Sequence, residues 1–122
     1  MNKNNIRWGE ILMDEEVAYS VGFWTVKAGK EEAFLKTWED FANWTLHNQK
    51  GSRNVVMLQD SEQQNRFISF GPWDNLESLQ SWRQQPEFKA AFLKFKELCD
   101  EIKPNTMKSV INISSELIQK QS

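Results

Sequence analysis

WDNLESLQSWRQQPEFKAAF, residues 73–92, is the stretch that decides the fold. Trp73 closes an apolar run of strand type, and Asp74 with Glu77 three residues later predicts a capped helix start. Trp82 falls near the end of that helix, and Pro86 suits the first position of the next one. The stretch therefore predicts a strand followed by two helices, with Trp82 where the helices meet over a sheet. It also suggests a small-molecule site without a metal ligand.

The sequence before this stretch predicts three strands and a helix. Residues 17–26 (VAYSVGFWTV) alternate as a strand does, and the turn KAGK follows them. RNVVMLQ (53–59) and RFISF (66–70) predict an antiparallel hairpin. Between the first strand and the hairpin, apolar residues at helical spacing predict a helix over about residues 30–47. Those positions are Ala33, Phe34, Trp38, Phe41, Ala42 and Thr45.

The sequence after Pro86 predicts one longer helix and a last strand. An apolar stripe runs from Phe88 to Ile102, and Pro104 is expected to stop the helix. Residues 107–115, with three β-branched apolar side chains, then predict the strand. Those side chains are Val110, Ile111 and Ile113.

The element order is β-α-β-β-α-β with the second helix broken near Pro86, which predicts an α+β, ferredoxin-like fold. Such a fold is a four-stranded antiparallel sheet with the helices on one face. Its other face needs a cover, and a second subunit is the simplest one. We expect residues 17–115 to form the domain. Residues 1–16 are interpreted as an N-terminal extension and residues 116–122 as a C-terminal tail, which dock on the partner or fray.

Composition limits the function classes. A chain of 122 residues predicts one domain. The net charge of −2, with scattered Lys and Arg, argues against a nucleic-acid or membrane partner. One histidine and one cysteine offer no zinc site and no internal disulfide. No secretory apolar segment is present, which predicts a cytoplasmic protein. Six Trp and eight Phe favour a ring-lined cavity or an oligomer interface.

Several short motifs occur in a fixed order and spacing. They are Val26-Lys27-x-Gly29-Lys30-Glu31-x-x-Phe34, Gly51 before the second strand, Phe70-x-x-Trp73, and Pro86-x-Phe88 at a helix start. Together they make residues 18–113 resemble the antibiotic biosynthesis monooxygenase family of dimeric α+β barrels, which also contains haem-degrading monooxygenases. The resemblance implies two sheets packed face to face in a homodimer, with a cavity in each subunit between sheet and helices.

Two functions agree with this resemblance. The first is a monooxygenase that uses no cofactor and oxidises a small aromatic or polyketide-like substrate with O2. In that chemistry the bound substrate anion reduces dioxygen directly, and the pocket desolvates and positions the pair. The second is a non-catalytic module of the same fold, which binds a small apolar molecule or whose pocket is filled by rings.

Haem degradation is disfavoured by the residues themselves. The haem-degrading branch uses a first-strand asparagine, a tryptophan, and an axial histidine about ten residues later. The matching positions here are Gly22, Trp82 and Phe92. Only the tryptophan is present, and phenylalanine cannot ligate iron.

Three residues are the catalytic candidates, each with a structural alternative. Trp82 is a pocket wall or N–H donor, or else a packed core residue. Arg83 is a partner for a substrate anion, or else a solvated helix-end cation. His47 is a general base, or else a side chain that complements the helix dipole.

The substrate-binding candidates are Trp82, Phe92, Trp24 and Asn54. Trp24 shares a sheet face with Gly22 because the two differ by two positions. Cys99 falls in the predicted helical stripe and is expected to be inert.

Overall fold

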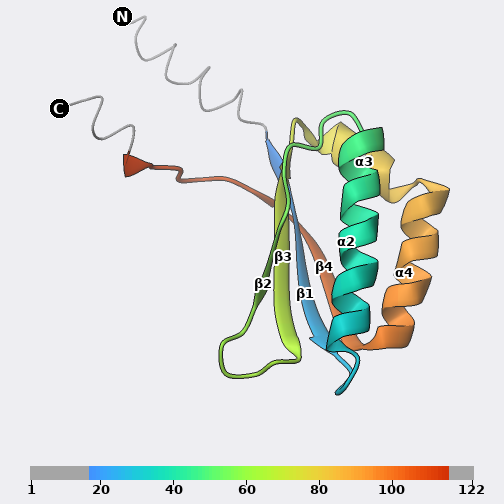
Figure 1. The fold of residues 1–122 in the computed structure, drawn as a ribbon. Coiled ribbons are helices and arrows are strands. Elements are labelled where there is room, and N and C mark those ends of the chain that lie inside the picture. The colour runs from blue at the N-terminus through green and yellow to red at the C-terminus, as the bar shows by residue number, and fades with distance from the viewer. Residues whose placement is uncertain (1–16, 116–122) are drawn as a thin grey trace, which may run out of the picture.

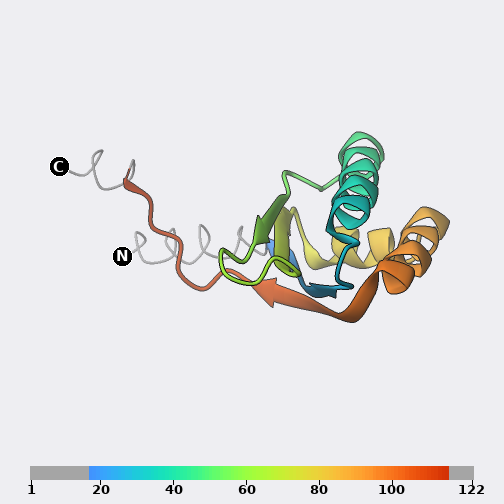
Figure 2. The same cartoon turned by 60° about the horizontal axis from the view of Figure 1, so that its bottom comes forward.

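The computed structural model describes residues 17–115, and the proposed extension and tail lie outside this range. The elements follow the predicted order: β1 (Ala18–Val26), α2 (Glu31–Asn48), β2 (Val56–Gln59), β3 (Arg66–Trp73), α3 (Leu76–Arg83), α4 (Pro86–Leu98) and β4 (Cys99–Lys108). The strands form one antiparallel sheet in the order β2-β3-β1-β4. The three helices lie on one face of it, so the predicted α+β, ferredoxin-like fold is confirmed (Figures 1 and 2).

The alternation of β1 and β3 separates the two faces of the sheet. Trp24 and Phe67 are paired neighbours, and both are buried beneath the helices. They join Val26, Phe34, Ala91, Phe95 and Cys99 in the main core. A second, smaller cluster of Ala18, Trp73 and Leu79 lies at the α3 end, with Trp82 packed against it.

The opposite face of the sheet carries exposed apolar side chains. Phe23 and Ile68 face each other across β1 and β3, and Leu58 pairs with Ile68 from β2. They are 37%, 41% and 51% exposed. In the described part of the chain no helix covers this face (Figure 2).

The C-terminal half of the prediction needs correction. The second long helix ends at Leu98 instead of reaching Ile102, and the last strand is Cys99–Lys108 instead of 107–115. Pro104 therefore lies inside β4, opposite Gly22. β4 is an edge strand, where a proline is tolerated because one side of the backbone needs no ladder partner.

The residues expected in the last strand lie beyond it. Val110, Ile111 and Ile113 follow β4 in an extended segment and are 77%, 78% and 72% exposed. Their β-branched run resembles a strand locally, but in the described part of the chain no neighbouring strand pairs with it. Cys99 is also misplaced by the sequence pattern, since it opens β4 instead of lying in a helix.

The cap of α3 differs by one residue from the prediction. Asn75, not Asp74, is the N-cap, and its Oδ1 accepts a hydrogen bond of 2.8 Å from the Ser78 backbone N–H. Asp74 instead accepts from Arg53 Nε at 2.8 Å, in an exposed ion pair. Both residue types suit a cap, so neighbouring candidates cannot be separated by type alone.

Candidate functional site

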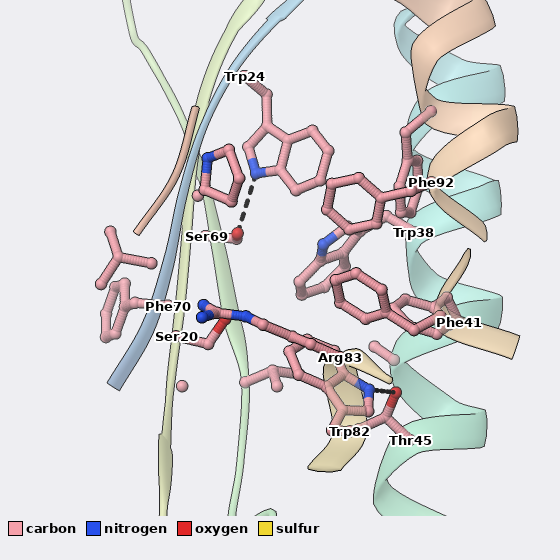
Figure 3. Close-up of a pocket in the computed structure, with 18 of the residues that line it drawn as sticks. Ser20, Trp24, Trp38, Phe41, Thr45, Ser69, Phe70, Trp82, Arg83 and Phe92 are labelled. Atoms are coloured by element: carbon pink, nitrogen blue, oxygen red, sulfur yellow. Dashed lines mark hydrogen bonds between the residues drawn. The ribbon is translucent and has the colours of Figure 1, made fainter. Parts of the chain in front are cut away.

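A pocket lies between the sheet and the three helices, at the place where the resemblance implied a cavity (Figure 3). Its free volume is about 60 Å³, which is room for a few water molecules. Nine of the nineteen described residues that line it are aromatic: Trp24, Trp38, Phe41, Phe70, Trp73, Trp82, Phe88, Phe92 and Phe95. The polar members include Ser20, Thr45, Ser69 and Arg83. Rings therefore fill most of the space between sheet and helices.

Trp24 forms the sheet-side wall. Its Nε1–H donates to Ser69 Oγ at 2.9 Å, and both residues are buried. Gly22, two residues earlier on the same face, makes this position possible. A Cβ there would lie 2.7 Å from Trp24 Nε1 and 2.9 Å from Ser69 Oγ. The indole of Trp24 thus occupies the space that a side chain at position 22 would need.

Trp82 forms the wall on the helix side, near the end of α3. Its Nε1–H donates to Thr45 Oγ1 of α2 at 3.1 Å. The ring stacks on Phe41, with centroids 5.7 Å apart, and meets Phe88 edge to face at 4.7 Å. Trp82 is half-buried. It is therefore both a packed residue and a pocket wall.

Arg83 extends from the end of α3 toward β1 and β4 (Figure 3). One terminal nitrogen donates to Thr106 Oγ1 and the other to the Asn105 carbonyl oxygen, at 3.1 Å for the latter. Both acceptors are neutral, and within residues 17–115 no carboxylate forms an ion pair with this guanidinium. Partial burial lowers the pKa of Arg83, but an arginine stays charged at neutral pH. The pocket thus contains an uncompensated positive charge.

Phe92 faces the pocket from α4, and its ring stacks on Phe88 with centroids 4.5 Å apart. The Trp24 ring lies 5.9 Å away. No histidine lines the pocket, and the space beside Gly22 is filled by Trp24. The residues present therefore do not fit a haem held in the manner of the haem-degrading branch. Within the described residues no group of three or more His, Cys, Asp or Glu could hold a metal ion.

Two predicted site residues lie outside the pocket. His47 is exposed in the last turn of α2, where its Nδ1 lies 2.7 Å from the Asn43 carbonyl oxygen. It does not reach the pocket and is not placed to act as a base there. Asn54 is exposed before β2, and its neighbour Val55 lines the pocket instead.

Four lining residues that carry polar groups or ring surface were not among the predicted site residues. Trp38 and Thr45 belong to the α2 apolar stripe, so helical spacing already placed them near the pocket. Ser20 has the parity of Trp24 on β1 and could have been found in the same way. Ser69 required the strand register, because only pairing with Gly22 places it beside Trp24.

Fold and pocket define a class: a ferredoxin-like α+β domain with a ring-lined site between sheet and helices. The family model described as antibiotic biosynthesis monooxygenase matches residues 18–93. The chain therefore belongs to this family. None of the described helices is long and apolar enough to cross a membrane.

Solved structures share the fold at low sequence identity. SnoaB from Streptomyces nogalater, described as a cofactor-independent oxygenase, superposes in a variant form with a TM-score of 0.74 at 15% identity, covering 80% of this chain and 97% of that one. A putative antibiotic biosynthesis monooxygenase from Nitrosomonas europaea gives 0.72 at 13%, covering 82% and 96%. A conserved protein from Methanosarcina mazei Go1 gives 0.73 at 20%, covering 81% and 98%. A search of curated proteins gave no match.

Proposed function

We propose that this protein is a monooxygenase that oxidises a small aromatic or polyketide-like molecule with O2 and needs no bound cofactor. Family membership supports a monooxygenase-type role. The observation that carries the proposal is the pocket itself, where aromatic walls surround one uncompensated guanidinium. Aromatic walls suit a planar substrate, and the cation suits the oxygen anion of a phenolate or enolate.

In this proposal the substrate itself is the reductant. A CH2 group beside an enolate oxygen loses its two hydrogens, one oxygen atom of O2 becomes a ketone oxygen, and the other leaves as water. Trp82, Trp24 and Phe92 exclude water and hold the ring plane, while Arg83 stabilises the anion that donates electrons. His47 and Asn54 have no part, because neither lines the pocket.

Oxygen uptake tests this proposal. Anthrones and oxidisable phenols, among them phenols that are ionised at the assay pH, are incubated with the wild type, with Trp82→Phe and Arg83→Ala, and with Lys89→Gln, an exposed α4 change outside the pocket. We expect uptake in the wild type and in Lys89→Gln, and a loss of about tenfold or more in Arg83→Ala. Uptake no faster than a heat-denatured control across the whole panel contradicts the proposal.

The size of the cavity favours a second candidate, a non-catalytic binding module. Its 60 Å³ lies well below the ~300 Å³ at which ordinary ligand pockets begin. A bicyclic substrate would enter only if half-buried rings such as Trp82 or Phe92 changed rotamer. Ligand binding without oxygen uptake would select the module over the enzyme.

We also propose that two copies associate through the open sheet face. Phe23, Leu58 and Ile68 lie there with a third or more of their surface exposed. Gel filtration should give a dimer at micromolar concentration for the wild type and a monomer for Ile68→Glu. Leu93→Glu is the control, since Leu93 is 65% exposed on α4. A monomeric wild type contradicts the assembly.

A further inference from the structure

Among residues 17–115, one titratable side chain lines the pocket, and it is the cation Arg83. The other lining residues in this range include no carboxylate, histidine, lysine, tyrosine or cysteine. In the described part of the chain, no lining group could take a proton from a neutral acid that enters this pocket. A ligand that is already ionised in water would meet the positive charge of Arg83 and, among these residues, no negative charge.

The guanidinium of Arg83 is held in place but not saturated. Thr106 Oγ1 and the Asn105 carbonyl oxygen each accept one of its hydrogen bonds. An arginine has five N–H donors, so three have no partner in the described part of the chain. The two fixed bonds, both to β4, reduce the entropy lost when a ligand binds to the remaining donors.

Ser20 adds a hydroxyl group to the same end of the pocket. It is paired with Thr106 across β1 and β4, and thus lies next to a residue that holds Arg83. Its side chain lies on the sheet side of the guanidinium in Figure 3. The half-buried rings of Trp82, Phe88 and Phe92 form the apolar remainder of the site. A cation and a hydroxyl group therefore lie at one end, and planar apolar walls at the other.

We propose that Arg83 is an anion-binding residue and that the pocket accepts planar aromatic anions in their already ionised form. This inference rests on the proposed function and narrows its substrate to planar enols and phenols acidic enough to be ionised in water, with aromatic carboxylates as unreactive probes of the same charge. Ionisation takes place in solution, and the pocket selects the anion by charge-assisted hydrogen bonds from Arg83. The rings select for planarity.

Matched pairs of ligands test the charge preference directly. Benzoate and 2-naphthoate are compared with benzamide and 2-naphthamide, which have nearly the same shape without the charge. Binding to the full chain is measured by calorimetry at low salt. In the wild type each acid should bind about tenfold or more tighter than its amide, the size expected for a hydrogen bond to a charged group.

Substitution at position 83 then assigns the preference to one residue. In Arg83→Gln we expect the acid-to-amide ratio to fall close to one, with the affinity for the amide unchanged. Arg83→Lys should keep part of the preference, and Lys89→Gln should keep all of it while making the same change in net charge. Circular dichroism confirms that each variant folds.

The outcomes separate this inference from the proposed oxygenase. Three results would each overturn the anion site. The first is an acid-to-amide preference that survives in Arg83→Gln, and the second is equal affinity of the wild type for acids and amides. The third is no binding of any of the four ligands at millimolar concentration. If the preference depends on Arg83 while no compound consumes oxygen, the anion site stands and the oxygenase falls. If Arg83→Gln consumes oxygen as fast as the wild type and also keeps the acid-to-amide preference, the oxygenase stands and the anion site falls.

Discussion

Two indoles face the pocket from opposite sides, and each donates its Nε1–H to a hydroxyl group. Trp24 donates to Ser69 within the sheet, and Trp82 donates to Thr45 between two helices. The first indole is 5% exposed and belongs to the main core, whereas the second is half-buried at the edge of the smaller cluster. The same kind of hydrogen bond thus holds Trp24 in a buried wall and Trp82 in a wall that solvent and ligand can reach.

The largest expected difference between the two sides is in stability. Trp24→Ala should lower the free energy of unfolding by about 3–5 kcal/mol, because the indole packs against Phe34 and Phe95 in a site without solvent. Trp82→Ala should cost about 2 kcal/mol, since part of that ring is already exposed. Urea unfolding at one fixed protein concentration measures both. Equal losses would show that Trp82 is as firmly packed as Trp24.

Gly22 extends the comparison of the two tryptophans, because it lies beside Trp24 on the sheet, where there is no room for a side chain. Gly22→Ala places a Cβ 2.7 Å from Trp24 Nε1 and should cost about 1–3 kcal/mol. In a Trp24→Phe background, where the Nε1 atom is absent, the same change should cost less. Additive losses in this double-mutant cycle would mean that the indole does not occupy the space beside Gly22.

Removing each hydroxyl partner compares the two hydrogen bonds themselves. Ser69→Ala leaves the buried Trp24 N–H without an acceptor and should cost about 1–3 kcal/mol. Thr45→Val should cost about 1 kcal/mol or less, because a water molecule in the pocket can accept from the half-buried Trp82. Thermal or urea unfolding measures the two variants side by side. A larger loss of stability in Thr45→Val than in Ser69→Ala would mean that water reaches Trp24 more easily than Trp82.

Local pattern was enough to predict the fold and to select Trp24 and Trp82, which form opposite walls of the pocket. Alternation put Trp24 and Gly22 on one face, and the 73–92 stretch put Trp82 between two helices. The end of α4 was wrong, because Pro104 breaks a helix but is also acceptable in an edge strand. The strand order β2-β3-β1-β4 shows that β4 lies at the edge of the sheet.

The polar part of the site depends on contacts that sequence spacing does not contain. Ser69 is 45 residues from Trp24, and Thr45 is 37 residues from Trp82. His47 was a candidate general base because it is the single histidine, but residue type does not indicate which way a side chain points. His47 lies two residues after Thr45 on α2. Side chains two positions apart on a helix point in different directions, so His47 points away from the pocket that Thr45 lines.

Titration of Cys99, which has no effect on stability at neutral pH, tests whether the core around Trp24 excludes water. Burial raises the pKa of its thiol from 9.0 to about 11. A folded pKa above the unfolded one means that the native state keeps the proton longer. The resulting stabilisation is complete below pH 9 and is lost as the pH rises toward 11.

At pH 7 the wild type should react slowly with a thiol reagent such as DTNB, because both the proton and the packing protect the sulfur. Between pH 9 and 11 the wild type should lose more stability than Cys99→Ala, in which this titration is absent. Rapid labelling of the folded protein at pH 8, or identical alkaline slopes for the two proteins, would mean that water reaches the cluster around Trp24 and that the two sides of the pocket differ less than their exposed areas indicate.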